Sequence, residues 1–190
     1  CSRCCHGMGN SIILDPYDVY RMTTGMGKSM QELLAASVEL NVVDGVILPN
    51  LKMQGTEEAC AYLDEEGRCS IHPYRPGICR LFPLGRYYEN GGFSYFLQTG
   101  ECAKENRSKI KVSKWIDTPD LTRNQQFTLQ WHDLLHAMEE RLTGEDEGKQ
   151  REENLLLLRL FYLLPYEGTI DFYTQFTERM EHWNGQNGQI

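Results

Sequence analysis

The segment CAYLDEEGRCSIHPYRPGICRLFP, residues 60–83, decides the fold because it gathers three cysteines into one turn-rich stretch. Cys60 and Cys69 stand at opposite ends of a predicted hairpin whose turn contains Gly67, so cross-strand pairing would bring their side chains together. Two prolines precede Cys79 and fix the backbone φ angle, so the loop loses less entropy when it closes around a ligand. The pattern predicts thiolates gathered around a metal ion.

The remaining cysteines extend this pattern. Cys1, Cys4 and Cys5 form a C-x-x-C-C cluster, and a C-x-x-C turn lets two sulfurs converge on one metal while backbone N–H groups point at them. The peptide between Cys4 and Cys5 is too short for relaxed disulfide geometry, so metal binding in a reducing compartment is favoured. The predicted metal ligands are Cys1, Cys4, Cys5, Cys60, Cys69, Cys79 and Cys102.

The number of cysteines leaves several kinds of centre open. A tetrahedral zinc ion would use four of the seven thiolates, two zinc ions sharing a bridging thiolate would use all seven, and an iron–sulfur cluster would use three or four. Cys5 can serve a second metal, bridge two metals or stay uncoordinated, and Cys102 can instead be a structural thiol. His6 and His72 lie close to cysteines and can complete a coordination sphere. The expected cofactor is zinc, iron or an iron–sulfur cluster.

Arginines accompany the cysteines along the chain. A cation close to a thiol lowers the pKa of that thiol and offsets the charge of the thiolate. This matters in a chain whose net charge is already −8. The arginines expected to act in this way are Arg3, Arg68, Arg75, Arg80 and Arg86.

Composition narrows the class of protein. Of the 190 residues, 41% are hydrophobic and 24% are charged, which is typical of a folded globular chain. The net charge of −8 argues against a nucleic acid or an anionic membrane as the main partner, since both require a basic surface. No apolar stretch reaches the roughly 18 residues of a membrane helix, and no signal peptide is visible. We therefore expect a cytoplasmic protein that binds metal ions, with a protein partner left open.

Cap and turn signals in the cysteine-rich part predict short helices and hairpins. Asp15 is placed as the N-cap of a helix that stops near Gly25, with proline at its first position. Ser29 and Glu32 have the spacing of a capping box at the start of a second helix. An Asn-Gly-Gly turn over residues 90–92 predicts a hairpin of aromatic strands, which we expect to cover the cysteines.

From residue 118 onward the apolar periodicity is helical. The pattern predicts helices over residues 121–142, 152–164 and 169–183. The expected fold class is α+β. We expect a single domain over residues 1–190, in which a cysteine-rich metal-binding part, residues 1–116, is buttressed by about three C-terminal helices in residues 117–190.

Four blocks of this sequence resemble a known family. CSRCC at residues 1–5 looks like the end of a C-x-x-C-x-x-C-C motif, and CAYL, GRCSI and YRPGICRLFP at residues 60–63, 67–71 and 74–83 resemble the family's other blocks. This is the YkgJ-like cysteine-cluster family, described as zinc- or iron-chelating and also found in flagellin lysine N-methylases. The resemblance runs from Cys1 to about Cys102 and implies metal chelation.

Three functions are compatible with these features. The first is a metal-binding protein whose zinc or iron–sulfur centre has a structural or redox role. The second is a metal-dependent enzyme, either an iron–sulfur oxidoreductase or, by analogy with the flagellin enzymes, a protein lysine N-methylase, although no nucleotide or S-adenosylmethionine loop is recognisable. The third is a metal-delivery or partner-binding module that uses the acidic helical part as a docking face.

Overall fold

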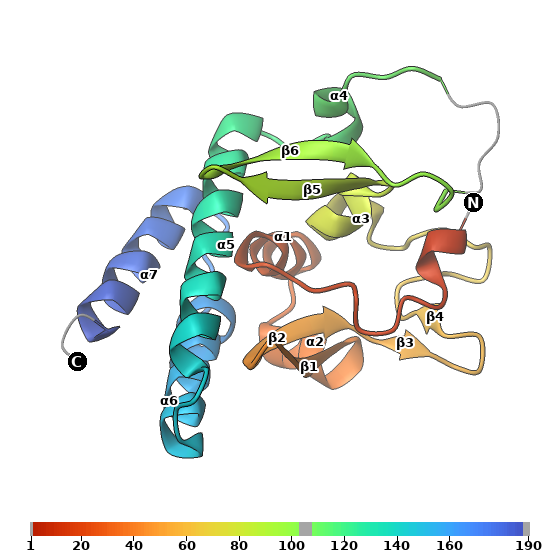
Figure 1. Cartoon of the computed structure of the whole chain (residues 1–190). Helices are drawn as coiled ribbons and strands as arrows, with labels where there is room; N and C mark the ends of the chain where they lie inside the picture. Colours follow the sequence, from red (N-terminus) through yellow and green to blue (C-terminus); the bar gives the residue numbers. More distant parts are fainter. Residues whose placement is uncertain (1, 103–107, 188–190) are drawn as a thin grey trace.

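Helix α1 (Pro16–Met26) lies at the centre of the molecule. The computed structural model describes residues 2–102 and 108–187. It places α1 between one hairpin, β5–β6, and a second hairpin, β1–β2 (Figure 1). Hairpins of antiparallel strands and a set of helices make an α+β fold, so the predicted class is confirmed.

The caps predicted from the sequence start the first two helices. The Asp15 side chain accepts a hydrogen bond from the Asp18 N–H while the Asp18 side chain accepts from the Asp15 N–H, which is a reciprocal capping box. Ser29 and Glu32 form the same arrangement at the start of α2 (Met30–Ala36). Helix α1 continues past Gly25 and ends at Gly27, whose φ of 64° gives the left-handed C-cap that favours glycine.

A hairpin that was not predicted follows α2. Strands β1 (Val38–Val43) and β2 (Val46–Leu51) pair in antiparallel register around Asp44 and Gly45, which both have positive φ. An Asp-Gly pair between two apolar runs is a strong signal for such a turn, so the sequence contained the information. The preceding segment joins this hairpin, since the Leu14 N–H donates to the Pro49 carbonyl at 2.8 Å.

The hairpin predicted over residues 60–72 is much shorter than expected, since it is reduced to the residues around the turn that contains Gly67. Cys60 belongs to β4 (Ala59–Cys60), which pairs with β3 (Met53–Gln54), and Leu63 with Cys69 makes an isolated bridge. The Asp64 side chain explains the difference. It accepts a hydrogen bond from the Arg68 N–H at 2.7 Å, and such local side-chain bonds favour a turn over a strand ladder.

The second predicted hairpin is confirmed, but it covers a different part of the molecule. Strands β5 (Leu84–Glu89) and β6 (Gly92–Leu97) pair around a turn at Asn90 and Gly91. The Tyr88 ring stacks on His132 of helix α5 with the ring centroids 3.7 Å apart. The hairpin therefore packs on the helical part, whereas we had expected it to cover the cysteines.

The C-terminal half is helical, as predicted, and the final helices carry most of the aromatic core. The helix predicted over 152–164 starts earlier, at Glu147, and becomes a π-helical turn before Pro165. A short helix, α4, was not predicted. The elements of this half are α4 (Val112–Ile116), α5 (Leu121–Leu142), α6 (Glu147–Leu158), η3 (Arg159–Leu163) and α7 (Phe172–Asn187).

One buried hydrophobic cluster includes residues from both halves of the chain. Tyr17 of α1 meets Phe172 of α7 edge-on, with the ring centroids 5.0 Å apart, and Phe127 of α5 meets the same ring at the same distance. Edge-to-face aromatic pairs of this kind stabilise a core beyond the burial of their area. One face of α1 is thus fixed to the helical half.

Within residues 2–102 and 108–187, no helix is both long and apolar enough to cross a bilayer.

Replacing Asn154 with alanine is expected to lower the free energy of unfolding by about 2–3 kcal/mol. This side chain of α6 is 4% exposed, accepts from the Ile47 N–H at 2.6 Å and donates to the Gly45 carbonyl at 3.2 Å. Its loss leaves two backbone groups of the β1–β2 hairpin without partners. Chemical denaturation measures the effect, and Asn184→Ala on the exposed face of α7 is the control. Equal shifts in the two variants would contradict this role of Asn154.

Candidate metal centre

The N-terminal turn that carries Cys4 and Cys5 lies beside the strand that ends at Cys60. The two cysteines belong to η1 (Arg3–Cys5), a single 3₁₀ turn. His6 then forms a bridge with Ala59 of β4. Backbone pairing therefore brings Cys4 and Cys5 close to Cys60, although more than fifty residues separate them in the chain.

Cys60 and Cys69 occupy two similar turns. In each turn, the residue three positions later donates its N–H to the cysteine carbonyl: Leu63 to Cys60 at 2.9 Å, and His72 to Cys69 at 3.2 Å. The backbone N–H groups two residues after each cysteine, those of Tyr62 and Ile71, donate to the sulfurs and favour the thiolate form. Such N–H donors are also known to tune metal-bound thiolates.

Cys79 lies in α3 (Gly77–Leu81), directly after the loop that contains Pro73 and Pro76. Burial raises the pKa of the Cys79 thiol, and the negative charges of Asp18 and of Cys60, Cys69 and Cys4 raise it further. The sulfur of Cys79 thus lies within electrostatic reach of cysteines from two other parts of the chain.

The five described cysteines of the N-terminal half act on one another. The Cys5 thiol donates a hydrogen bond to Cys4, which is the main reason that the pKa of Cys4 falls to about 6. The same hydrogen bond raises the pKa of Cys5, and burial with the charges of Cys4, Cys60 and Cys79 adds to the effect. None of Cys4, Cys5, Cys60, Cys69 and Cys79 forms a disulfide. The structure therefore collects five reduced thiols from three turns and helix α3.

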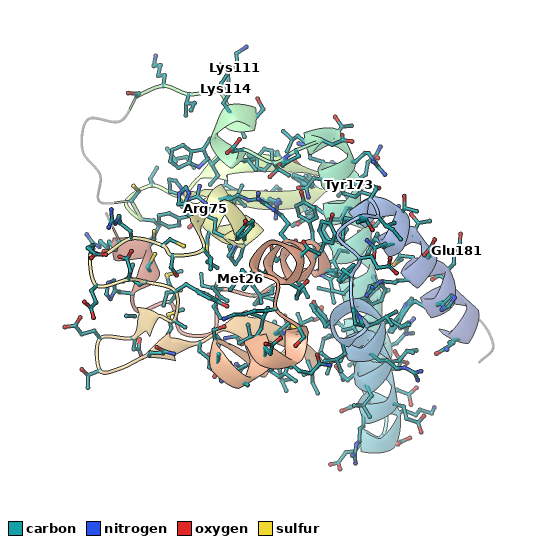
Figure 2. All side chains as sticks on the ribbon, turned by 180° about the vertical axis from the view of Figure 1, so that it is seen from behind. Met26, Arg75, Lys111, Lys114, Tyr173 and Glu181 are labelled. Atoms are coloured by element: carbon teal, nitrogen blue, oxygen red, sulfur yellow. The ribbon has the colours of Figure 1, made fainter. Side chains whose placement is uncertain are left out.

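Of the predicted arginines, Arg75 acts on the thiols. Its charge works to lower the pKa of Cys4 and of Cys69, although burial leaves the pKa of Cys69 raised overall. Figure 2 shows Arg75 on the side of the molecule that carries the cysteine-rich turns, away from α7, where Glu181 lies. Arg68 pairs with Asp64 and Glu66, so its charge is already balanced by carboxylates.

The donor set fits a soft or borderline metal ion, because it consists of thiolates with backbone N–H support. As placed in the described part of the chain, no three His, Cys, Asp or Glu side chains converge closely enough to hold one ion. Ionising these cysteines without a cation between them is costly. The hydrogen bond to Cys4 is the main cause of the raised pKa of Cys5 and burial is the main cause for Cys79, and the charges of neighbouring cysteines raise both further. Closure of the cysteines into a coordination sphere is therefore expected to accompany metal binding.

The other predicted ligands lie at the edge of this group or outside the description. Cys1 lies outside the described residues. Cys102 is half-buried and follows β6, next to residues 103–107, which also lie outside the description. His6 is half-buried in its bridge with Ala59, and His72 is exposed at the start of η2 (His72–Tyr74).

Sequence reasoning missed the polar residues that hold the Cys79 loop. Asp18 of α1 accepts a hydrogen bond from the Gly77 N–H at 2.6 Å, and Arg21 donates to the Pro73 carbonyl. Asp18 has the spacing of a capping residue after Asp15, and that signal was in the sequence. Its second contact depends on how α1 and the loop pack together, so no local pattern could have indicated it.

Comparison with known proteins agrees with this chemistry. A family model named CxxCxxCC, described as “Putative zinc- or iron-chelating domain”, matches residues 1–126, well over half of the 190-residue chain. No curated protein and no solved structure matches the chain.

In the metal-free protein, alkylation of Cys4 is expected to rise with pH through a midpoint of about 6, because the thiolate is the reactive form. Cys5→Ala removes the hydrogen bond that contributes most to the low pKa, so the midpoint should move up by about one pH unit or more. Cys5→Ser keeps a donor and should leave the midpoint near that of the wild type. Peptide mapping by mass spectrometry measures the labelling, and an unchanged midpoint in Cys5→Ala would show that Cys5 is not the donor.

Proposed function

Since this chain belongs to the CxxCxxCC family of zinc- or iron-chelating domains, we propose that its cysteine thiolates hold a zinc or iron centre that organises the N-terminal half. The observation that carries the proposal is the group of five cysteines that three separate turns and helix α3 bring within electrostatic reach of one another. The ligands are proposed to come from Cys4, Cys5, Cys60, Cys69 and Cys79, together with Cys1 and Cys102.

A structural role is favoured by the elements that carry the cysteines. The turn η1, the two-residue strand β4 and the five-residue helix α3 are too short to be stable alone. In η1 no residue is buried, and in α3 the buried residues are Arg80 and Leu81. When bound, zinc or iron would crosslink these elements, and iron would add redox chemistry. Metal affinity would then be part of the folding free energy.

The chain's own residues prepare this centre. The N–H groups of Tyr62 and Ile71 stabilise the thiolates of Cys60 and Cys69, and Arg75 offsets part of the negative charge. Cys79 is a ligand that would gain from a nearby cation, because burial and its anionic neighbours oppose its ionisation. We place the protein in a reducing compartment such as the cytoplasm, since reduced thiols such as those of Cys4, Cys5, Cys60, Cys69 and Cys79 persist there.

We also propose that the chain is a single domain. The hydrophobic cluster runs from Ile12 and Leu14 to Phe176 and Trp183, so residues 1–116 and 117–190 bury apolar surface against each other. The excess of negative charge disfavours a nucleic-acid partner. The metal ion is the partner that the site chemistry supports.

The proposal is tested by elemental analysis of protein purified without oxygen, read together with its visible spectrum. Zinc in near-stoichiometric amount without colour would indicate a closed structural site. Iron with broad absorbance near ~400 nm and acid-labile sulfide would indicate a cluster. A fully folded protein with neither metal would overturn the proposed function.

Cys79→Ala is expected to lose most of the bound metal and to lower the melting temperature by about 5–10 °C. Loss of a ligand should weaken binding by more than about 100-fold, or about 2.7 kcal/mol, and each kcal/mol is worth about 2–4 °C in a chain of this size. Elemental analysis and thermal unfolding measure the two effects. Ile78→Ala changes the exposed neighbour in the same helix and should keep its metal. Full metal content in Cys79→Ala would remove Cys79 from the site.

A further inference from the structure

Helix α1 carries no cysteine, yet it makes three contacts with the loop that precedes Cys79. The Asp18 carboxylate accepts from the Gly77 N–H at 2.6 Å, and the Arg21 guanidinium donates to the Pro73 carbonyl. Gly25 lies so close to the Tyr74 ring that an added Cβ would come within 2.3 Å of it. One face of α1 is therefore shaped to the loop at three successive helical turns.

Asp18 is the contact nearest to the cysteine. Gly77 is the first residue of α3, and the N–H groups of a first helical turn have no acceptor within their own helix. Asp18 supplies one. Its side chain is held from the other side by the Asp15 N–H, at 3.2 Å, and the residue is 2% exposed. A carboxylate buried with a donor on each oxygen has little freedom to move, so it fixes the start of α3 relative to α1.

We propose that Asp18 is a positioning residue of the metal centre, which holds the Gly77 turn so that Cys79 is presented to the other thiolates. This inference rests on the proposed function. It makes the geometry of the centre depend on a helix whose other face is fixed in the aromatic core. Tyr17, the residue next to Asp18, packs edge-on against Phe172 of α7, so the helical half supports the centre through α1.

Electrostatics alone would give Asp18 the opposite effect. Burial is the main cause of the raised pKa of Cys79, and the negative charge of Asp18 is the next largest. If charge were the only contribution of Asp18, removing that charge would favour the thiolate and strengthen metal binding. If Asp18 positions the loop, Asp18→Asn weakens binding, because the amide has a single acceptor oxygen for two N–H donors and its NH₂ group cannot accept. The two accounts therefore predict effects of opposite sign.

Helix α2 supplies a matched control. Glu32 occupies the same capping-box position as Asp18, with its side chain accepting from the Ser29 N–H at 2.8 Å, and it is exposed. Glu32→Gln should weaken the capping of α2 as much as Asp18→Asn weakens the capping of α1, and it leaves the contacts of the Cys79 loop unchanged. Any difference between the two variants in metal binding then reports the contact between Asp18 and Gly77.

The experiment compares wild type, Asp18→Asn and Glu32→Gln by the rate at which a zinc or iron chelator removes the bound metal. In the metal-free proteins, amide hydrogen exchange at Gly77 and alkylation of Cys79 are measured as well. Asp18→Asn should lose metal about 10–100-fold faster than wild type, which is the usual effect of losing a residue that orients a ligand. Its Gly77 amide should exchange faster, and Glu32→Gln should match the wild type in all three measurements.

Metal retention in Asp18→Asn that equals or exceeds that of the wild type would overturn the proposal. If Asp18→Asn fails to fold, Arg21→Met replaces it, since that variant removes a second anchor of the loop and leaves the capping box intact. If the wild type binds no metal through its thiolates, the proposed function fails. Hydrogen exchange at the Gly77 amide and alkylation of Cys79 in the metal-free proteins still decide whether Asp18 holds the loop. Equal exchange and alkylation in all variants would show that it does not.

Discussion

The cost of ionising several neighbouring, partly buried cysteines is the constraint on which the N-terminal half of this structure depends. Three turns and helix α3 bring Cys4, Cys5, Cys60, Cys69 and Cys79 within electrostatic reach of one another. Burial raises the pKa of Cys60, Cys69 and Cys79, the hydrogen bond to Cys4 raises that of Cys5, and the charges of neighbouring cysteines add to these shifts. The elements that carry them are too short to overcome this cost. A bound cation would offset the cost of ionising these thiols, and this is how a metal would stabilise the fold.

The centre is not isolated from the rest of the molecule, because α1 lies between the cysteine loop and the helices (Figure 1). Its polar residues, Asp18 and Arg21, bond to the loop, while Tyr17 packs into the aromatic core. Such an arrangement gives flexible turns a rigid support. It also explains why a cysteine-rich segment is attached to a helical half that contributes no cysteine.

Local signals in the sequence were sufficient to predict those elements that are held by contacts between residues close together in the chain. Asp15 with Pro16 started α1, and the Asn-Gly turn at residue 90 set the β5–β6 register. The β1–β2 hairpin was missed even though its Asp44-Gly45 turn was visible. The predicted hairpin between Cys60 and Cys69 is reduced to a single bridge, because the Asp64 side chain favours a turn. The family's cysteine pattern could be recognised from spacing, whereas the contact between Asp18 and Gly77 depends on tertiary packing.

X-ray absorption at the zinc or iron edge of the metal-replete protein tests the central claim most directly, because it reads the atoms bound to the metal. The account predicts a first shell dominated by sulfur, at about 2.3 Å for zinc. That shell should lose sulfur when Cys79 is replaced. A first shell made of nitrogen and oxygen alone would contradict the account, since the metal would then be held by groups other than these cysteine thiolates.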